Sequence, residues 1–235
     1  MNEVDVGGIL SRTFRIVGDS ARASALFTIV FGALGAAAEL FGLVDSSEFA
    51  FGIGGGFVVD ENTTAIQVVF ELGLLAASLV GFYLLMREQL RSQGKLGTGG
   101  GSFWFFLGMS ILALLGVMLG FFLLIVPGII IMVRWAAANG FVISKGLGPV
   151  EALKASWKAT DGHSWSIFLA GLVLTIGIGV VAGIIVVPLA AVSLTVAGVV
   201  APFLDAFGNV LTFGFSVAVY CLVHNDEEEM AEVFR

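Results

Sequence analysis

The sequence has few of the residues on which catalytic and metal sites depend. Its 235 residues include one cysteine, Cys221, and two histidines, His163 and His224. A single cysteine excludes an intrachain disulfide and a thiolate metal cluster. Each histidine stands alone, without a nucleophile and an orienting carboxylate that would complete a catalytic set. We therefore predict no enzyme activity, no cofactor and no metal site.

Charged residues are also scarce. They make up 12% of the chain, against about 25% in typical soluble domains. Hydrophobic residues make up 58%, and the mean hydropathy is +1.03. A chain with so little charge cannot cover a water-facing surface, so we predict a membrane protein with membrane lipids as its partners. The net charge of -7 argues against binding to nucleic acid, which favours basic surfaces.

Long apolar stretches predict an all-α fold in which one membrane domain occupies residues 1–235. A helix needs about 20 mostly apolar residues to cross a bilayer. The pair Pro127-Gly128 predicts a helix break, so that the third and fourth spans form a hairpin. An acidic tail follows over 225–235. The six predicted spans are 23–43, 65–86, 103–126, 129–144, 164–190 and 196–223.

Basic residues are distributed unevenly between the predicted spans. The segment before the first span, the one between the second and third, and the one between the fourth and fifth contain every Lys and Arg except Arg134 and Arg235. The segment between the first two spans contains no basic residue. Positive charge collects on the cytoplasmic side of membrane proteins, so this pattern predicts that both termini are cytoplasmic. The acidic residues of the segment between the first two spans are Asp45, Glu48, Asp60 and Glu61.

Two short segments are predicted to form amphipathic helices in the cytoplasmic membrane interface, over 8–18 and 149–160. Their expected apolar faces carry Leu10, Phe14 and Val17 in one, and Val150, Leu153 and Trp157 in the other. The two segments align at a constant offset, which indicates an internal repeat of one interfacial helix plus two spans; the alternative is that any interfacial helix has this pattern. Basic residues on these helices either bind anionic lipid or simply anchor the helix ends. The predicted lipid contacts are Arg12, Phe14, Arg15, Lys154, Trp157 and Lys158.

Four ionisable residues fall inside predicted spans: Glu39, Glu71, Arg134 and Asp205. A charge in hydrocarbon needs a partner, water or neutralisation. Counting about 1.5 Å per residue places all four roughly 6–10 Å below the outer boundary, so we expect them to form an intramembrane cluster. Two interpretations stay open. The cluster is a polar pocket or pathway for a zwitterionic head group or a proton, or Arg134 pairs with one or two acids to hold four spans together.

Two further stretches of sequence indicate a family. Residues 127–135 read PGIIIMVRW, and residues 151–162 read EALKASWKATDG. Together they resemble the membrane domain associated with glycerophosphoryl diester phosphodiesterases, and related bacterial membrane proteins. Thr13-Phe14-Arg15 fits as well. The match is specific over about 124–168, and the residues that carry it are Pro127, Gly128, Arg134, Ala152, Leu153, Ser156 and Trp157.

This resemblance implies a multi-pass protein of the bacterial inner membrane with a lipid context. It does not imply phosphodiesterase activity, because the chain lacks the metal site of histidines and carboxylates and a soluble region long enough for a catalytic barrel. We therefore expect a non-enzymatic, lipid-interacting scaffold or accessory subunit. The alternative is a transporter of a small molecule, an ion or a lipid that uses the intramembrane cluster. Whether a protein partner or a second copy of the chain binds to it is left open.

Overall fold

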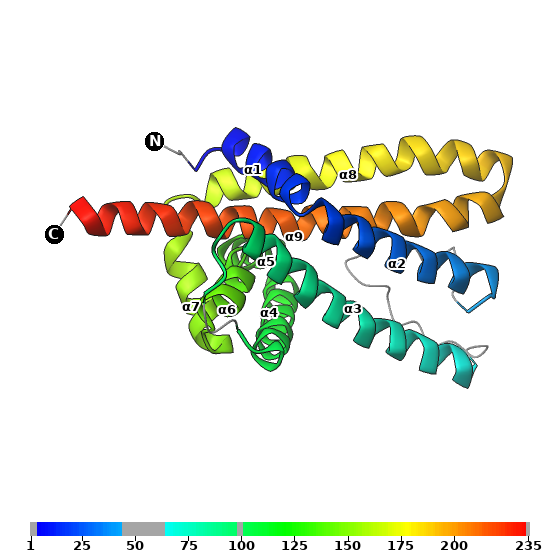
Figure 1. Ribbon diagram of the computed structural model, residues 1–235, viewed down its shortest axis with the longest axis horizontal. Coiled ribbons are helices and arrows are strands. Elements are labelled where there is room, and N and C mark those ends of the chain that lie inside the picture. The colour runs from blue at the N-terminus through cyan, green and yellow to red at the C-terminus, as the bar shows by residue number, and fades with distance from the viewer. Residues whose placement is uncertain (1–3, 44–63, 98–100, 234–235) are drawn as a thin grey trace. The chain divides into compact units, whose positions relative to one another are not determined.

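The structure is a computed structural model that describes residues 4–43, 64–97 and 101–233, with side chains to residue 224. This part of the chain contains helices and turns and no strand (Figure 1). Asp45, Glu48, Asp60, Glu61 and Arg235 lie outside the described residues, as do the side chains of the acidic tail. The helices are α1 (Val6–Asp19), α2 (Ala21–Leu40), α3 (Ala65–Ser92), α4 (Phe103–Leu123), α5 (Ile125–Arg134), α6 (Ala138–Lys145), α7 (Pro149–Ala159), α8 (Ser164–Val192) and α9 (Leu194–Val233).

Six helical segments are long and apolar enough to cross a membrane, which confirms the prediction of an all-α, multi-pass membrane protein. The fourth of these segments differs from the prediction because it consists of two helices, α5 and α6, separated by turns at residues 135–137. The candidate spans are Ala21–Leu40, Ala65–Ser92, Phe103–Leu123, Ile125–Lys145, Ser164–Val192 and Leu194–His224.

The hairpin between α4 and α5 turns at Leu124, so the predicted break at Pro127 and Gly128 is wrong. Leu124 has extended backbone angles, φ -165 and ψ 154, whereas Pro127 and Gly128 lie inside α5. Proline is tolerated there because the N–H groups of a first helical turn have no partner within the helix. Gly128 is buried, and a side chain on it would overlap the Phe121 ring of α4. The Pro-Gly pair therefore lies in the first turn of a helix and lets that helix approach its neighbour closely.

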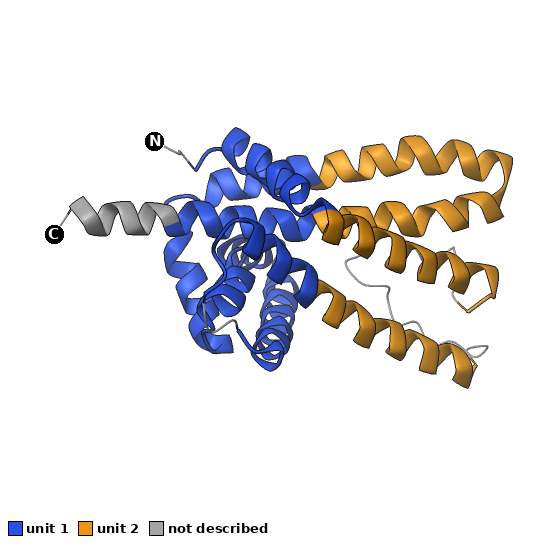
Figure 2. Cartoon of the chain, viewed as in Figure 1, with its two compact units in different colours: residues 1–21, 83–174, 211–235 blue, residues 22–82, 175–210 orange. Residues whose placement is uncertain are grey.

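The described helices divide into two compact units (Figure 2). Unit 1 contains residues 1–21, 83–174 and 211–235, and unit 2 contains residues 22–82 and 175–210. Each unit is assembled from segments that are distant in the sequence. The prediction of one membrane domain over 1–235 stays a prediction.

In unit 1, α4 packs along α5 and α7, and α6 packs along α7. Close approach between α4 and the helices that follow it depends on glycine, since a side chain on Gly116 would overlap the Trp135 ring. The C-terminal half of α9 contributes Tyr220, which is fully buried, packs edge-on against Phe141 at 5.0 Å and donates a hydrogen bond to Ser144 Oγ at 2.9 Å. The core at this point therefore combines aromatic packing with a hydroxyl group that has a hydrogen-bond partner.

In unit 2, the helices pack through small residues. A side chain on Gly32 of α2 would overlap Phe203 of α9, and a side chain on Gly35 would overlap Pro202. Phe27 of α2 stacks on Phe82 of α3 with ring centroids 5.7 Å apart. Small residues at such contacts let helix backbones approach closely, which is the main source of packing energy between helices in lipid.

The contact between Gly140 of α6 and Tyr220 predicts a specific sensitivity. A methyl group on Gly140 would overlap the buried ring, so we expect Gly140→Ala to lower the free energy of unfolding by about 1–3 kcal/mol. The matched control is Gly177→Ala on α8, where no atom lies within 4 Å of the added methyl group. Thermal unfolding in lipid nanodiscs should show a lower midpoint for Gly140→Ala alone. Equal midpoints for the two variants would contradict the packing described here.

Candidate functional site

The break between α5 and α6 releases backbone carbonyl groups that other helices then satisfy. Ser156 Oγ and Thr160 Oγ1, both on fully buried residues of α7 and the turn after it, donate hydrogen bonds to the Arg134 carbonyl at 2.7 and 3.2 Å. Ser216 Oγ of α9 donates to the Ala136 carbonyl at 2.6 Å. Non-helical backbone in an apolar surrounding is tolerated only where such partners exist. The break is therefore a junction of three helices, held by side-chain hydrogen bonds to the carbonyl groups that the break leaves free.

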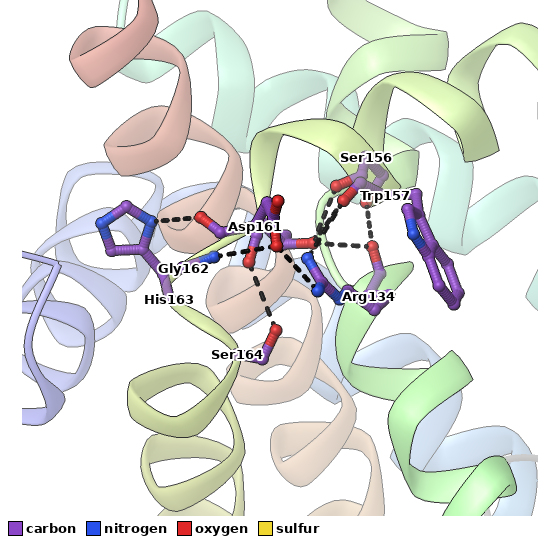
Figure 3. Close-up of polar contacts among 8 residues, drawn as sticks. Arg134, Ser156, Trp157, Asp161, Gly162, His163 and Ser164 are labelled. Atoms are coloured by element: carbon purple, nitrogen blue, oxygen red, sulfur yellow. Dashed lines mark hydrogen bonds and ion pairs between the residues drawn. The ribbon is translucent and has the colours of Figure 1, made fainter.

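The Arg134 side chain forms further polar contacts at this junction (Figure 3). Its Nη2 donates to Asp161 Oδ1 at 2.8 Å, and its Nη1 donates to the Trp157 carbonyl at 3.3 Å. Its guanidinium carbon also lies 5.4 Å from the centroid of the Trp157 ring, within range of a cation–π interaction. The Arg134 side chain is 19% exposed and that of Asp161 is 77% exposed. The ion pair thus joins the end of α5 to the turn between α7 and α8.

Arg134 has a carboxylate partner that the sequence prediction did not name. One of the two open interpretations paired Arg134 with one or two acids of the cluster, and in the structure it forms an ion pair with Asp161. The prediction treated 129–144 as one straight helix, and the intramembrane cluster of Glu39, Glu71, Arg134 and Asp205 stays a prediction. A helix that ends at Arg134 turns the guanidinium toward the α7–α8 turn instead.

The ion pair also bears on the predicted depth of Arg134. Asp161 follows the helix that carries Lys154 and Lys158, in the segment that was assigned to the basic side of the membrane. The ion pair brings Arg134 to the level of that segment. An outer-leaflet position for Arg134 is therefore incompatible with a cytoplasmic position for the second amphipathic helix.

The two amphipathic helices have matching patterns of burial. With an offset of 143 residues, the buried residues Ile9, Thr13 and Ile16 of α1 align with the buried residues Ala152, Ser156 and Ala159 of α7. The long helices that follow begin at the same offset, at Ala21 and Ser164. This agreement supports the internal repeat, because the aligned positions share their burial as well as their residue types.

The exposed positions match as well. Phe14 is 57% exposed and the aligned Trp157 is 42% exposed. Each is followed by an exposed cation, Arg15 in α1 and Lys158 in α7. In α1 the buried face carries Ile9, and Phe14 of the predicted apolar face is left exposed to its surroundings. Each helix presents an adjacent aromatic and basic side chain.

Of the six predicted lipid contacts, Phe14, Arg15, Lys154, Trp157 and Lys158 are exposed. Arg12 differs, because it is half-buried and its guanidinium interacts with the Cys221 thiol of α9. The lipid contacts, Arg12 among them, stay a prediction. An exposed aromatic ring beside a cation suits the membrane interface, where the ring lies at head-group level and the cation meets lipid phosphate.

Sequence reasoning missed Asp161, Ser156 and Thr160 as parts of the junction. Ser156 and Thr160 are four residues apart, so they lie on one face of the helix and its terminal turn, which was the available signal. It also missed that Asp19, at the end of α1, accepts a hydrogen bond from Gln93 Nε2 at 2.9 Å. No group of three His, Cys, Asp or Glu residues within the described ranges could hold a metal ion.

The ion pair predicts a dependence of stability on pH. Hydrogen bonding and electrostatic attraction by Arg134 lower the pKa of Asp161 from its ordinary value of 3.8. A carboxylate whose pKa is lowered by folding stabilises the folded state above its ordinary pKa, and this stabilisation is lost as the pH falls through the lowered value. We expect Asp161→Asn to lower the unfolding temperature at pH 7, and its difference from the wild type to shrink as the pH falls below 3.8.

The control for this measurement is the Arg134→Gln background, in which Asp161→Asn should change the unfolding temperature little at any pH. Circular dichroism melts in nanodiscs between pH 7 and pH 3 provide the readout. A difference between Asp161→Asn and the wild type that is constant over this range would contradict the assignment of the ion pair.

The residues of the family resemblance meet in this junction. Arg134, Ser156 and Trp157, which come from both matching stretches of sequence, form direct contacts with one another. The contacts give a physical reason for the co-occurrence of these residue types, and the family itself stays a prediction. Comparison of the chain with protein-family models, with curated proteins and with solved structures finds no match.

Proposed function

We propose that this chain is a non-enzymatic membrane protein that binds anionic lipid through α1 and α7 and acts as a lipid-interacting scaffold or accessory subunit. The observation that carries this proposal is the repeated, exposed pair of an aromatic and a basic residue, Phe14-Arg15 and Trp157-Lys158. Both pairs lie on helices whose opposite faces are buried within unit 1. The same chemistry at two aligned positions supports a shared lipid-facing role.

The charges on these helices are sufficient for a measurable lipid preference. Each basic residue near an anionic membrane surface contributes about 1 kcal/mol. Arg15, Lys154 and Lys158 are all exposed. Together they favour an anionic over a neutral bilayer by about 3 kcal/mol, which corresponds to roughly a hundredfold difference in affinity.

The proposed setting is the bacterial inner membrane, with both termini in the cytoplasm. The asymmetric distribution of Lys and Arg supports this orientation. The resemblance to the membrane domain of glycerophosphoryl diester phosphodiesterases supports the bacterial setting and the lipid context. A transporter that uses the four-residue cluster has less support, because Arg134 is already bound by Asp161 and Trp157.

Neutralising the aligned cations tests lipid binding. We expect Arg15→Gln with Lys158→Gln to weaken binding of phosphatidylglycerol by roughly thirtyfold, and to leave binding of phosphatidylcholine unchanged, because about 2 kcal/mol of electrostatic attraction is removed. Native mass spectrometry with titrated lipid measures both affinities. The matched control is Arg91→Gln on α3, whose guanidinium already lies 3.8 Å from Glu88. Equal affinity of the wild type for the two lipids would contradict the proposal.

The orientation has a separate test. In a Cys221→Ser background, we expect single cysteines at Ser92 and Lys158 to react with a membrane-impermeant maleimide in inside-out vesicles only. A cysteine at Gly42, which follows α2, should react in right-side-out vesicles only. Labelling of the Lys158 position from the outside would reverse the proposed topology.

A further inference from the structure

Asp205 is the one charged side chain in a long apolar hairpin. Between His163 and His224 the sequence contains no other Asp, Glu, Lys or Arg. Asp205 lies in α9, about 11 residues or 16 Å along the helix from its start at Leu194. It is exposed, and it has no hydrogen-bond or ion-pair partner among the described residues. A carboxylate in this position requires an explanation.

The compact unit that holds Asp205 does not supply a cation for it. The described residues of unit 2 contain one basic residue, Arg22, at the first position of the unit. The remaining charged groups there are the carboxylates Glu39 and Glu71. Ionisable side chains inside membranes normally pair or face a polar partner, because an unpaired charge in hydrocarbon is costly. Asp205 therefore lacks within its own unit the kind of group that would stabilise it.

The helix surface around Asp205 is suited to close contact with another helix. Ala201 lies one turn before it and Asn209 one turn after it, so the three side chains share one face of α9. Ala201 and Asn209 are partly exposed, so the neighbouring helices cover this face of α9 incompletely. Small residues let helices approach each other in lipid, and polar side chains then form hydrogen bonds between them.

We propose that Asp205 and Asn209 form a docking site for a membrane-spanning helix of a partner protein that carries a lysine or arginine at matching depth. Charge complementarity selects this occupant. A second copy of the chain cannot supply the cation, because its Arg134 is bound by Asp161 and its other basic residues lie at or beyond the ends of the apolar stretches. A lipid head group carries its charge at the membrane surface rather than beside a carboxylate deep in an apolar helix.

This docking site uses residues that the lipid-binding proposal does not. The lipid contacts lie on α1 and α7, whereas Asp205 and Asn209 lie on α9. Variants at one set leave the other set intact. Either proposal can therefore fail without the other.

Synthetic transmembrane peptides provide the test. The probes are leucine-based helices with one lysine, placed in a series of three positions one helical turn apart, and a matched helix with leucine instead. Energy transfer between the labelled full-length protein and a labelled peptide in phosphatidylcholine vesicles measures association. We expect one lysine peptide to bind the wild type about tenfold more tightly than the leucine peptide, because an interhelical polar contact in lipid contributes enough for this difference.

Variants assign this preference to Asp205. Asp205→Leu should bind the lysine and leucine peptides equally, and Asp205→Asn, which keeps the shape of the side chain, should lose most of the preference. Glu71→Gln on α3 is the matched control and should behave as the wild type. If Asp205→Leu does not fold, Asp205→Asn decides the question.

Three results would overturn the proposal. The first is equal binding of all peptides to the wild type, and the second is a lysine preference that survives in both Asp205 variants. The third is self-association of the wild type that depends on Asp205 and excludes the peptides, which would assign the face to a second copy.

Discussion

The need to satisfy backbone carbonyl groups at the break after Arg134 governs the arrangement of unit 1. An apolar chain has little water or polar surface with which to hydrogen-bond an interrupted helix. Here the hydroxyl groups of Ser156, Thr160 and Ser216 reach the free carbonyls. Because these donors come from α7, its terminal turn and α9, the break fixes the positions of three elements at once. The Arg134–Asp161 pair then adds a charged contact on the exposed side.

The break also explains the short length of α5. A helix of 10 residues would be a poor unit by itself, but Gly128 lets it pack closely on α4. The next helix, α6, packs against the buried Tyr220 at Gly140, which has no side chain to obstruct the ring. Close packing without side chains thus compensates for short helices in this part of the chain.

The sequence predicted the helices better than their interruptions. Apolar stretches of about 20 residues indicate spanning helices because length and hydropathy are local properties, and the six segments of the structure agree with them. Pro127 and Gly128 were misread because proline serves both as a breaker and as a first-turn residue. The position of Leu124 depends on packing between α4 and α5, which no local pattern shows.

The candidate site, too, could be predicted from the sequence only where its residues follow a local pattern. Phe14, Arg15, Trp157 and Lys158 could be named as candidate lipid contacts because the repeat and the amphipathic pattern are visible in the sequence, and their role stays a prediction. Asp161 could not be assigned to Arg134, because they lie 27 positions apart along the chain with a helix break between them, and only the fold brings them together. The inward turn of Arg12 likewise depends on its proximity to α9.

The duplication of the aromatic and basic pair has a consequence for avidity. Because α1 and α7 belong to one compact unit, contact of one helix with a membrane component keeps the other at a high effective concentration near the same component. Under the proposed lipid binding, two weak attachments in this arrangement would give a residence time that neither would give alone. Occupancy would then rise steeply with the surface density of the component, so that the molecule discriminates between membrane regions by composition.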